Sequence, residues 1–390
     1  MIADWPERPR SARTLSWAAW TVGLLMCGAV EAIEAPKPQA PPPAAEPAQR
    51  AAVSPTDQRE FYRVLQRSAH TRTLRGLTIP PATIAALARG EADAAVASLS
   101  ALAGQGDKDA NIALVRIQHW CNRIASARQG ASQEQIAKLS SVLTEERAAK
   151  AAGVVQAESE YQKVARDACF KARFDFGAIE ARLREAAQQG HAASAAELAQ
   201  FVRDPQQREA LLQAAIKQRY APAMYIAATN LVMAVQRGQT TENVSQIRLW
   251  LKQAGPTMPK AKLDLANCMS LGCDGHPADA LSARAFGLDA ARDGEPTAFP
   301  SIMRMPWGGR LTRVQHLAWQ YFGDRLNEAG CTGEAYLPSA ATFAQNIAML
   351  EKGQPSQVLD EGRREADVLW RDNGARAMKE QGCYQEGTSD

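Results

Sequence analysis

Two cysteines and a histidine form the tightest group of potential metal ligands in this chain of 390 residues. Cys268 and Cys273 have four residues between them, and His276 follows after two more. Thiolates and imidazole suit tetrahedral Zn²⁺, but such a site needs a fourth ligand, which the neighbouring sequence does not offer. The alternative is a small disulfide at the junction of a helix and a loop, which requires a sharp turn at Gly272. We predict this disulfide and no metal site.

The other cysteines of the chain could likewise be either disulfide-bonded or free thiols. One of the seven, Cys27, lies in the N-terminal leader described below, and the other six are Cys121, Cys169, Cys268, Cys273, Cys331 and Cys383. An even number in an exported chain predicts three disulfides, for which fifteen connectivities exist. Pairing of sequence neighbours is favoured, because a helical array keeps such residues near in space. Six buried, reduced thiols would instead fit a chain that stays in the cytosol.

The segment Met305-Pro306-Trp307-Gly308-Gly309-Arg310 is the best candidate for a binding loop. Trp and Arg are enriched among the residues that dominate binding energies, and paired glycines free the backbone. Trp307 and Arg310 are therefore the candidate binding residues. The alternative for Trp307 is a packing anchor between two parts of the fold.

The sequence contains no recognisable catalytic arrangement. It lacks a Gly-x-Ser-x-Gly segment, a phosphate-binding loop, a dinucleotide fingerprint and a His-Glu-x-x-His helix. His119 and Cys121 lie two residues apart, so on a helix they point to different faces. Acidic side chains such as Glu180, Glu185 and Glu197 fit solvated helix faces. We therefore predict no catalytic residues and no cofactor.

The elements that must position these residues form a recurring pattern. A Gly is followed after three residues by a small residue and after three more by an apolar pair. The copies begin 84, 29, 38 and 37 residues apart, at Gly106, Gly190, Arg219, Thr257 and Gly294. In the clearest copy a helix ends at Gly190, and Ser194 and Leu198 share one face of the next helix. Such recurrence is typical of stacked helical units.

One unit carries a resemblance to a known family. Its matching residues are Trp250 and Ala254 at a helix end, Ala261, Leu265 and Ala266 in the next helix, 271–275 in a loop, Asp279 as N-cap, and 290–294. These residues resemble the Sel-one-like repeats, relatives of the tetratricopeptide repeat. Arg219 and Thr257 replace the usual Gly, so there the turn is either strained by about 1 kcal/mol or of another type. The resemblance implies an all-α fold, an α-solenoid of stacked antiparallel helix pairs with a concave binding face, in a family of scaffolds and adaptors.

Residues 306–390 lack the repeat but keep a helical period. The first apolar stripe consists of Val314, Leu317, Ala318, Tyr321, Phe322 and Leu326. A second helix should follow Pro338 and a third, long one should start near Ser356. Cys331 and Cys383 would both lie just beyond helix ends. A bridge between them would hold the last helix as a cap over the array, whose terminal apolar face would otherwise meet water.

The N-terminus has the layout of a secretory signal peptide. Three arginines precede an uncharged stretch over residues 15–30, and Ala32 or Ala35 suits cleavage. The alternatives are an uncleaved anchor and a lipoprotein modified at Cys27. Residues 36–55 are rich in Pro and Ala, so they should form an extended tether.

The expected organisation is a signal peptide (1–35), a Pro/Ala-rich linker (36–55), N-terminal helices (56–100), helical repeats (101–305) with an insertion near 120–170, and a C-terminal helical cap (306–390). The net charge of +3 comes from 45 basic and 42 acidic residues, so nucleic acid is not an expected partner. We expect an exported scaffold, periplasmic or at the cell surface, that binds protein partners in the envelope, without a membrane span in the mature chain. The alternatives are a binder of peptides or cell-wall fragments, and an enzyme with an unrecognised site in the C-terminal helical region.

Overall fold

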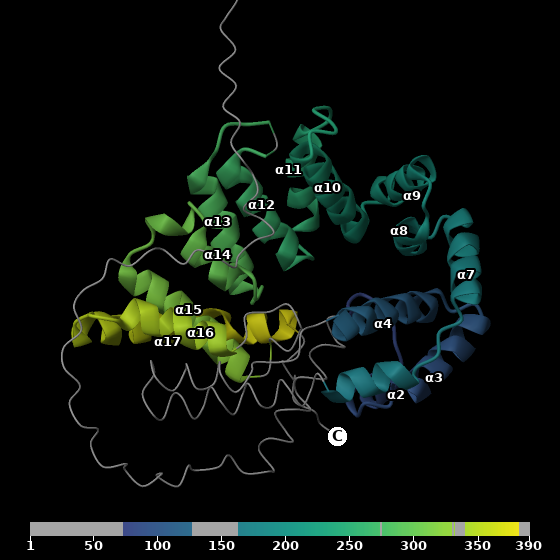
Figure 1. Ribbon diagram of the computed structural model, residues 1–390, viewed down its shortest axis with the longest axis horizontal. Helices are drawn as coiled ribbons and strands as arrows, with labels where there is room; N and C mark the ends of the chain where they lie inside the picture. The colour runs from purple at the N-terminus through teal and green to yellow at the C-terminus, as the bar shows by residue number, and fades with distance from the viewer. Residues whose placement is uncertain (1–72, 127–162, 274, 330, 332–339, 382–390) are drawn as a thin grey trace, which may run out of the picture.

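The computed structural model describes residues 73–126, 163–273, 275–329, 331 and 340–381, and every regular element in them is a helix (Figure 1). This confirms the predicted all-α class. The elements are α2 (Pro81–Ala88), α3 (Ala92–Gly104), α4 (Lys108–Ser126), α7 (Phe176–Gln188), α8 (Ala192–Phe201), α9 (Pro205–Lys217), α10 (Ala221–Gln236), α11 (Ser245–Ala254), α12 (Pro259–Leu271), α13 (Ala280–Arg292), α14 (Ala298–Arg304), η2 (Gly308–Arg310), α15 (Arg313–Glu328), α16 (Ala340–Glu351) and α17 (Ser356–Glu380). None of these helices is both long and apolar enough to span a bilayer.

Successive helices pack side by side, and the pairs follow one another along an arc (Figure 1). The first helices of neighbouring pairs also meet, because α8 contacts both α4 and α10. The second helices α7, α9 and α11 have no comparable contacts with one another. In a curved stack the closer contacts lie on the inside of the curve, so α4, α8 and α10 line the inner face. The predicted α-solenoid is confirmed.

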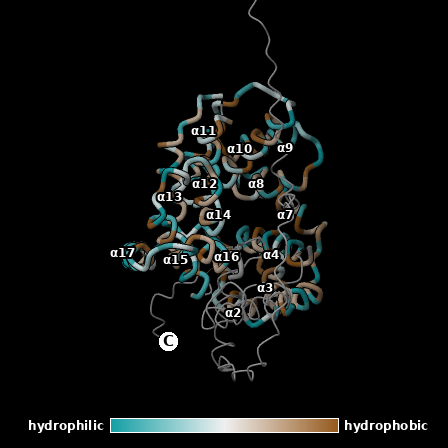
Figure 2. The backbone as a smooth tube through the Cα atoms, turned by 60° about the vertical axis from the view of Figure 1, so that its left-hand side comes forward, coloured by the Kyte–Doolittle hydropathy of each residue, from teal (hydrophilic) through white to brown (hydrophobic). Residues whose placement is uncertain are grey.

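The hydrophobic core continues along the array. One cluster joins α2, α3, α4, α7 and the helical residues 163–171, and another extends from α10 to α17. A small, mostly alanine cluster between α8, α9 and α10 separates them, formed by Ala195, Ala196, Ala199, Leu212, Ala215 and Ala223. Hydrophobic residues accordingly recur from helix to helix through the described part of the chain (Figure 2). The apolar side chains of each unit are buried mainly by the neighbouring units, as in other helical arrays.

The turns between helices confirm both alternatives considered for the missing glycines. Gly190 has φ 83°, a left-handed conformation that costs Gly little. Arg219 adopts the same region with φ 57°, and after it the Tyr220 N–H donates to the Ala215 carbonyl at 3.2 Å, which closes the turn. Thr257 is not left-handed, so the turn after α11 has a different geometry. The turn at Arg219 is therefore strained, by about 1 kcal/mol, whereas the turn at Thr257 is not.

The helix α17 covers the C-terminal end of the array, against α15 and α13. Asp293, the C-cap residue of α13, pairs with Lys262 at 2.6 Å and with Arg376 of α17. The Asp293 carbonyl also accepts a hydrogen bond from Gln381 Nε2 at 3.2 Å. The predicted helical cap is therefore confirmed.

The two ends of the arc meet. Arg75, which precedes α2, lies with its Nη1 3.2 Å from Oε2 of Glu380, the last residue of α17. The two residues are 305 positions apart in the sequence. Figure 1 shows the beginning of the array and α17 approaching the same region.

A disulfide fastens α4 to the helical residues 163–171. Cys121 and Cys169 are bonded, with Cα atoms 5.4 Å apart, within the usual range for a disulfide. Cys331 is also disulfide-bonded, and its expected partner Cys383 lies outside the described residues. The insertion expected near 120–170 is described only at its two ends, which this disulfide joins.

Removing disulfides should destabilise the protein according to loop length. The Cys121–Cys169 bond has a sequence separation of 48, whereas the second disulfide, Cys268–Cys273, has a separation of 5. Loop-closure entropy predicts that replacing both cysteines by Ser costs about 4 kcal/mol for the first and about 2 kcal/mol for the second. Urea denaturation of the two double variants measures this difference. An equal loss would show that loop closure does not determine their contributions.

Adding one methyl group at Gly323 of α15 should destabilise the C-terminal core. A Cβ at Gly323 would lie 2.5 Å from Phe343 Cε1 and 2.9 Å from the ring of Phe299. We expect Gly323→Ala to lower the free energy of unfolding by about 1–3 kcal/mol through overpacking. Gly309→Ala is the matched control, because no atom lies within 4 Å of its would-be Cβ. Equal stability of the two variants in urea denaturation would contradict this account of the packing.

Candidate functional site

Polar side chains connect neighbouring helices of the inner face. Arg116 of α4 places its Nε 2.8 Å from Oε1 of Glu197 on α8. Its Nη2 donates to the Tyr220 hydroxyl at 3.1 Å, and its Nη1 donates to the Arg75 carbonyl at 2.8 Å. One guanidinium therefore joins α4, α8, the start of α10 and the segment that precedes α2.

Burial makes this ion pair an important structural contact. The side chains of Arg116 and Glu197 are only 17% and 8% exposed. Burial alone would lower the pKa of Arg116, but the Glu197 carboxylate and the Tyr220 hydroxyl outweigh it, so the pKa is raised. Burial also raises the pKa of Tyr220. The second Glu197 oxygen accepts a hydrogen bond from the exposed Gln200 at 2.7 Å, which connects the pair to the surface.

The expectation that Glu197 lies on a solvated helix face was wrong. Its side chain is buried because α4 packs across α8 and brings Arg116 to it. Glu185 is exposed as expected, and Glu180 is partly exposed and pairs with Arg184 one turn along the same helix. Arg116 could have been singled out from the sequence. It is the charged residue within the otherwise apolar segment 112–117, and the apolar residues around it are buried.

A second polar group lies farther along the array, between α10, α12 and the turn before α14. The Tyr225 hydroxyl donates to Asp264 Oδ2 at 2.8 Å, and Lys260 Nζ lies 3.1 Å from Asp264 Oδ1. Lys260 also reaches Thr297 Oγ1 at 3.4 Å, and that hydroxyl donates to Glu295 Oε1 at 2.5 Å. These contacts hold three neighbouring elements in register.

Burial changes the protonation of this second group. It raises the pKa of Glu295, and the Asp264 carboxylate adds to the rise while Lys260 opposes it. Burial and the same carboxylate raise the pKa of Tyr225. The phenol therefore stays protonated and acts as a hydrogen-bond donor. The group orients helices and presents a fixed pattern of donors and acceptors.

The two residues predicted for the binding loop have different surroundings. Trp307 has no exposed surface; its ring fills the space beside Gly287, and its Nε1 donates to Asn267 Oδ1 at 3.3 Å. Arg310 is exposed on η2. This placement favours the packing alternative for Trp307 and leaves Arg310 as the accessible candidate.

The cysteines considered for a metal site are bonded to each other. Cys268 and Cys273 form a disulfide with Cα atoms 5.0 Å apart, and Gly272 provides the sharp turn with φ 71°. Among the residues that the structure describes, no three His, Cys, Asp or Glu side chains gather to hold a metal ion. The structure thus contains the disulfide that the spacing of these cysteines predicts.

Removing one member of the buried pair should be costly. Glu197→Ala leaves Arg116 buried without its carboxylate, so we expect a loss of about 3–5 kcal/mol in the free energy of unfolding. Glu180→Ala is the control, because its exposed pair with Arg184 contributes at most about 1 kcal/mol. Chemical denaturation distinguishes the two. Comparable losses would show that the buried Arg116–Glu197 pair contributes no more to the free energy of unfolding than the exposed Glu180–Arg184 pair.

Comparisons with known proteins give limited information. No model of a known protein family matches the chain, and no curated protein matches it at a significant level. The chain is similar to the crystal structure of a protective antigen of uropathogenic Escherichia coli that displays an SLR (Sel-one-like repeat) fold. The sequence identity is 14%, the TM-score is 0.32, and the match covers 78% of this chain and 74% of the other. The helical array is established by the packing of this chain's own helices, independently of that similarity.

Proposed function

We propose that the protein is a scaffold that binds a protein partner on the inner face of its helical array. The observation that best supports this is the fixed arrangement of polar side chains between neighbouring helices, in which Arg116 holds Glu197 on the inner face and Tyr225 of α10 holds Asp264 of α12. Their geometry is set before any partner arrives. A preformed surface loses little conformational freedom on binding, so more of the contact energy appears as affinity.

The proposed compartment is the cell envelope, most simply the periplasm. The disulfides Cys121–Cys169 and Cys268–Cys273 fit an oxidising environment. The arginine-rich start and apolar stretch of residues 1–35 support export. The two observations are independent, since one is local to the leader and the other to the folded array.

The chemistry of the inner face favours a polar partner surface. The buried charges of Arg116 and Glu197 are paired with each other, so an incoming protein gains little from opposing either of them with a charge of its own. Gln200 is exposed beside the Arg116–Glu197 pair and has donors and acceptors to offer. We therefore expect hydrogen bonds to give specificity here, with a few larger anchors supplying most of the binding energy.

Site-specific cross-linking tests this function. A photoreactive phenylalanine analogue at Gln200, on the inner helix α8, should form an adduct with an envelope protein in intact cells. The same analogue at Gln207, exposed on the second helix α9, is the matched control and should give little adduct. Mass spectrometry identifies the captured molecule.

Three results would contradict the proposal. Adducts of equal yield at both positions would mean that the inner face has no special role. The absence of any adduct at Gln200 would argue against a partner on this face. Capture of only a short peptide or a cell-wall fragment at Gln200 would replace the scaffold with a smaller-ligand binder.

A further inference from the structure

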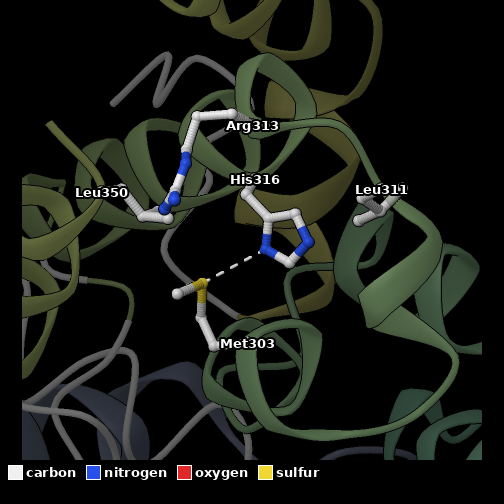
Figure 3. Close-up of a pocket in the computed structure, with 5 residues that line it drawn as sticks. All are labelled: Met303, Leu311, Arg313, His316 and Leu350. Atoms are coloured by element: carbon white, nitrogen blue, oxygen red, sulfur yellow. Dashed lines mark hydrogen bonds between the residues drawn. The ribbon is translucent and has the colours of Figure 1, made fainter. Parts of the chain in front are cut away.

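A pocket of about 350 Å³ lies among the end of α14, the start of α15 and α16 (Figure 3). It is lined by Met303, Leu311, Arg313, His316 and Leu350. None of these residues belongs to the inner-face contacts described above. The pocket is therefore a separate candidate site, independent of the proposed scaffold function.

Most of the pocket wall is apolar and held in place. Leu350 is 2% exposed, and Met303 and Leu311 are partly buried. The His316 ring has a contact at each nitrogen, because Nε2 lies 3.0 Å from the Gly308 carbonyl oxygen and Nδ1 lies 3.3 Å from the Met303 sulfur. Since both nitrogens are engaged, the ring acts as a fixed part of the wall.

Arg313 is the polar side chain of the pocket that is not engaged elsewhere. It is exposed, and among the described residues it has no hydrogen-bond or ion-pair partner. Figure 3 shows its side chain extending from α15 toward the side of the pocket that Leu350 lines. A guanidinium is not deprotonated in proteins, so the pocket carries one permanent positive charge.

The neighbouring sequence adds positive charge around the pocket. Arg304 and Arg310 are exposed and likewise have no ion-pair partner in the part of the chain that the structure describes. Residues 296–323 contain no Asp or Glu. On α16 the acidic residue is Glu351, whose Oε1 already accepts a hydrogen bond from the Tyr321 hydroxyl at 2.5 Å. In a chain whose net charge is only +3, this segment is a local concentration of cations that attracts anions.

The lining selects the class of anion. A planar guanidinium matches a carboxylate with two parallel hydrogen bonds, and the three apolar side chains favour a hydrocarbon body. A phosphate would bring further charged oxygens against apolar walls, which is unfavourable. A cavity of roughly 150 Å³ already holds a benzene molecule, so this pocket has room for a short hydrocarbon chain or one ring.

We propose that the pocket binds a small apolar monocarboxylate, such as a short-chain fatty acid. Arg313 pairs with the carboxylate, and Met303, Leu311 and Leu350 surround the hydrocarbon chain. A ligand with additional polar groups fits less well, because His316 is already engaged at both nitrogens.

Hexanoate is a suitable probe, and the methionine in the pocket wall reports its binding. The purified protein carries ¹³C-labelled methionine methyl groups, and Met303→Leu identifies the Met303 resonance. We expect that resonance to shift and to saturate with hexanoate, while the resonance of Met233, which is 45% exposed on α10, stays in place. Hexanamide, the neutral analogue of the same length, should bind about tenfold more weakly. Each methylene removed from the acid should weaken binding by about fourfold.

Two arginine substitutions separate a built site from general attraction of anions. Arg313→Gln removes the charge inside the pocket, so we expect it to weaken hexanoate binding by about tenfold and to leave hexanamide binding unchanged. Arg310→Gln is the matched control, because it removes a nearby exposed charge that does not line the pocket. It should change the affinity by less than about twofold, since salt screens an exposed charge outside the site.

Four results would overturn the proposal. The absence of a saturable shift at Met303 would show that hexanoate does not enter the pocket. Equal affinity for hexanoate and hexanamide would remove the role of the carboxylate. Equal losses in the two arginine variants would reduce the effect to attraction by a basic surface. Tighter binding of hexyl phosphate than of hexanoate would make the pocket a phosphate site.

Discussion

The fold depends on the close approach of helices at small residues. Alanines at the contacts between successive helices are fully buried, among them Ala228, Ala261, Ala266, Ala283, Ala290 and Ala298. Side chains of this size let helix backbones come near each other, and any larger residue would push the units apart. Only because α4 and α8 are so close does Arg116 reach Glu197. The polar contacts of the inner face are thus a consequence of apolar packing behind it.

Local features of this architecture were predictable from the sequence, and long-range ones were not. Gly190 ends a helix, and Asp279 caps the next-to-last repeat helix by accepting the Ser282 N–H at 3.0 Å, because both roles depend on residues a few positions away. Glu197 depends on Arg116, 81 residues earlier, so its pattern on α8 alone indicated a solvated face. The buried Arg116–Glu197 pair was missed for that reason, although the resemblance to helical repeats did imply a concave binding face.

The loop around Trp307 is a second case in which contacts between segments, rather than local residue types, determine the role of a residue. Its residue types suggested binding, yet the space for the ring is created by the absence of a side chain at Gly287, twenty residues earlier. The two glycines that follow also differ. Gly308 packs against the Ile302 backbone, whereas Gly309 has open space around it. A paired-glycine motif therefore combines a packing requirement with a free position, and only the tertiary structure separates them.

The strengths of the contacts at the two ends determine how accessible the inner face is. α17 is held firmly, because Asp293 is 5% exposed and pairs with both Lys262 and Arg376. The contact that joins the ends of the arc is weaker, since Arg75 and Glu380 are 35% and 39% exposed and such a pair contributes about 0–1 kcal/mol. Breaking this one ion pair costs little and leaves the buried pairs of Asp293 intact. The Asp293 pairs therefore hold α17 on α13 whether or not Arg75 and Glu380 stay in contact, and separation of these two residues would give the proposed partner protein a route to the inner face.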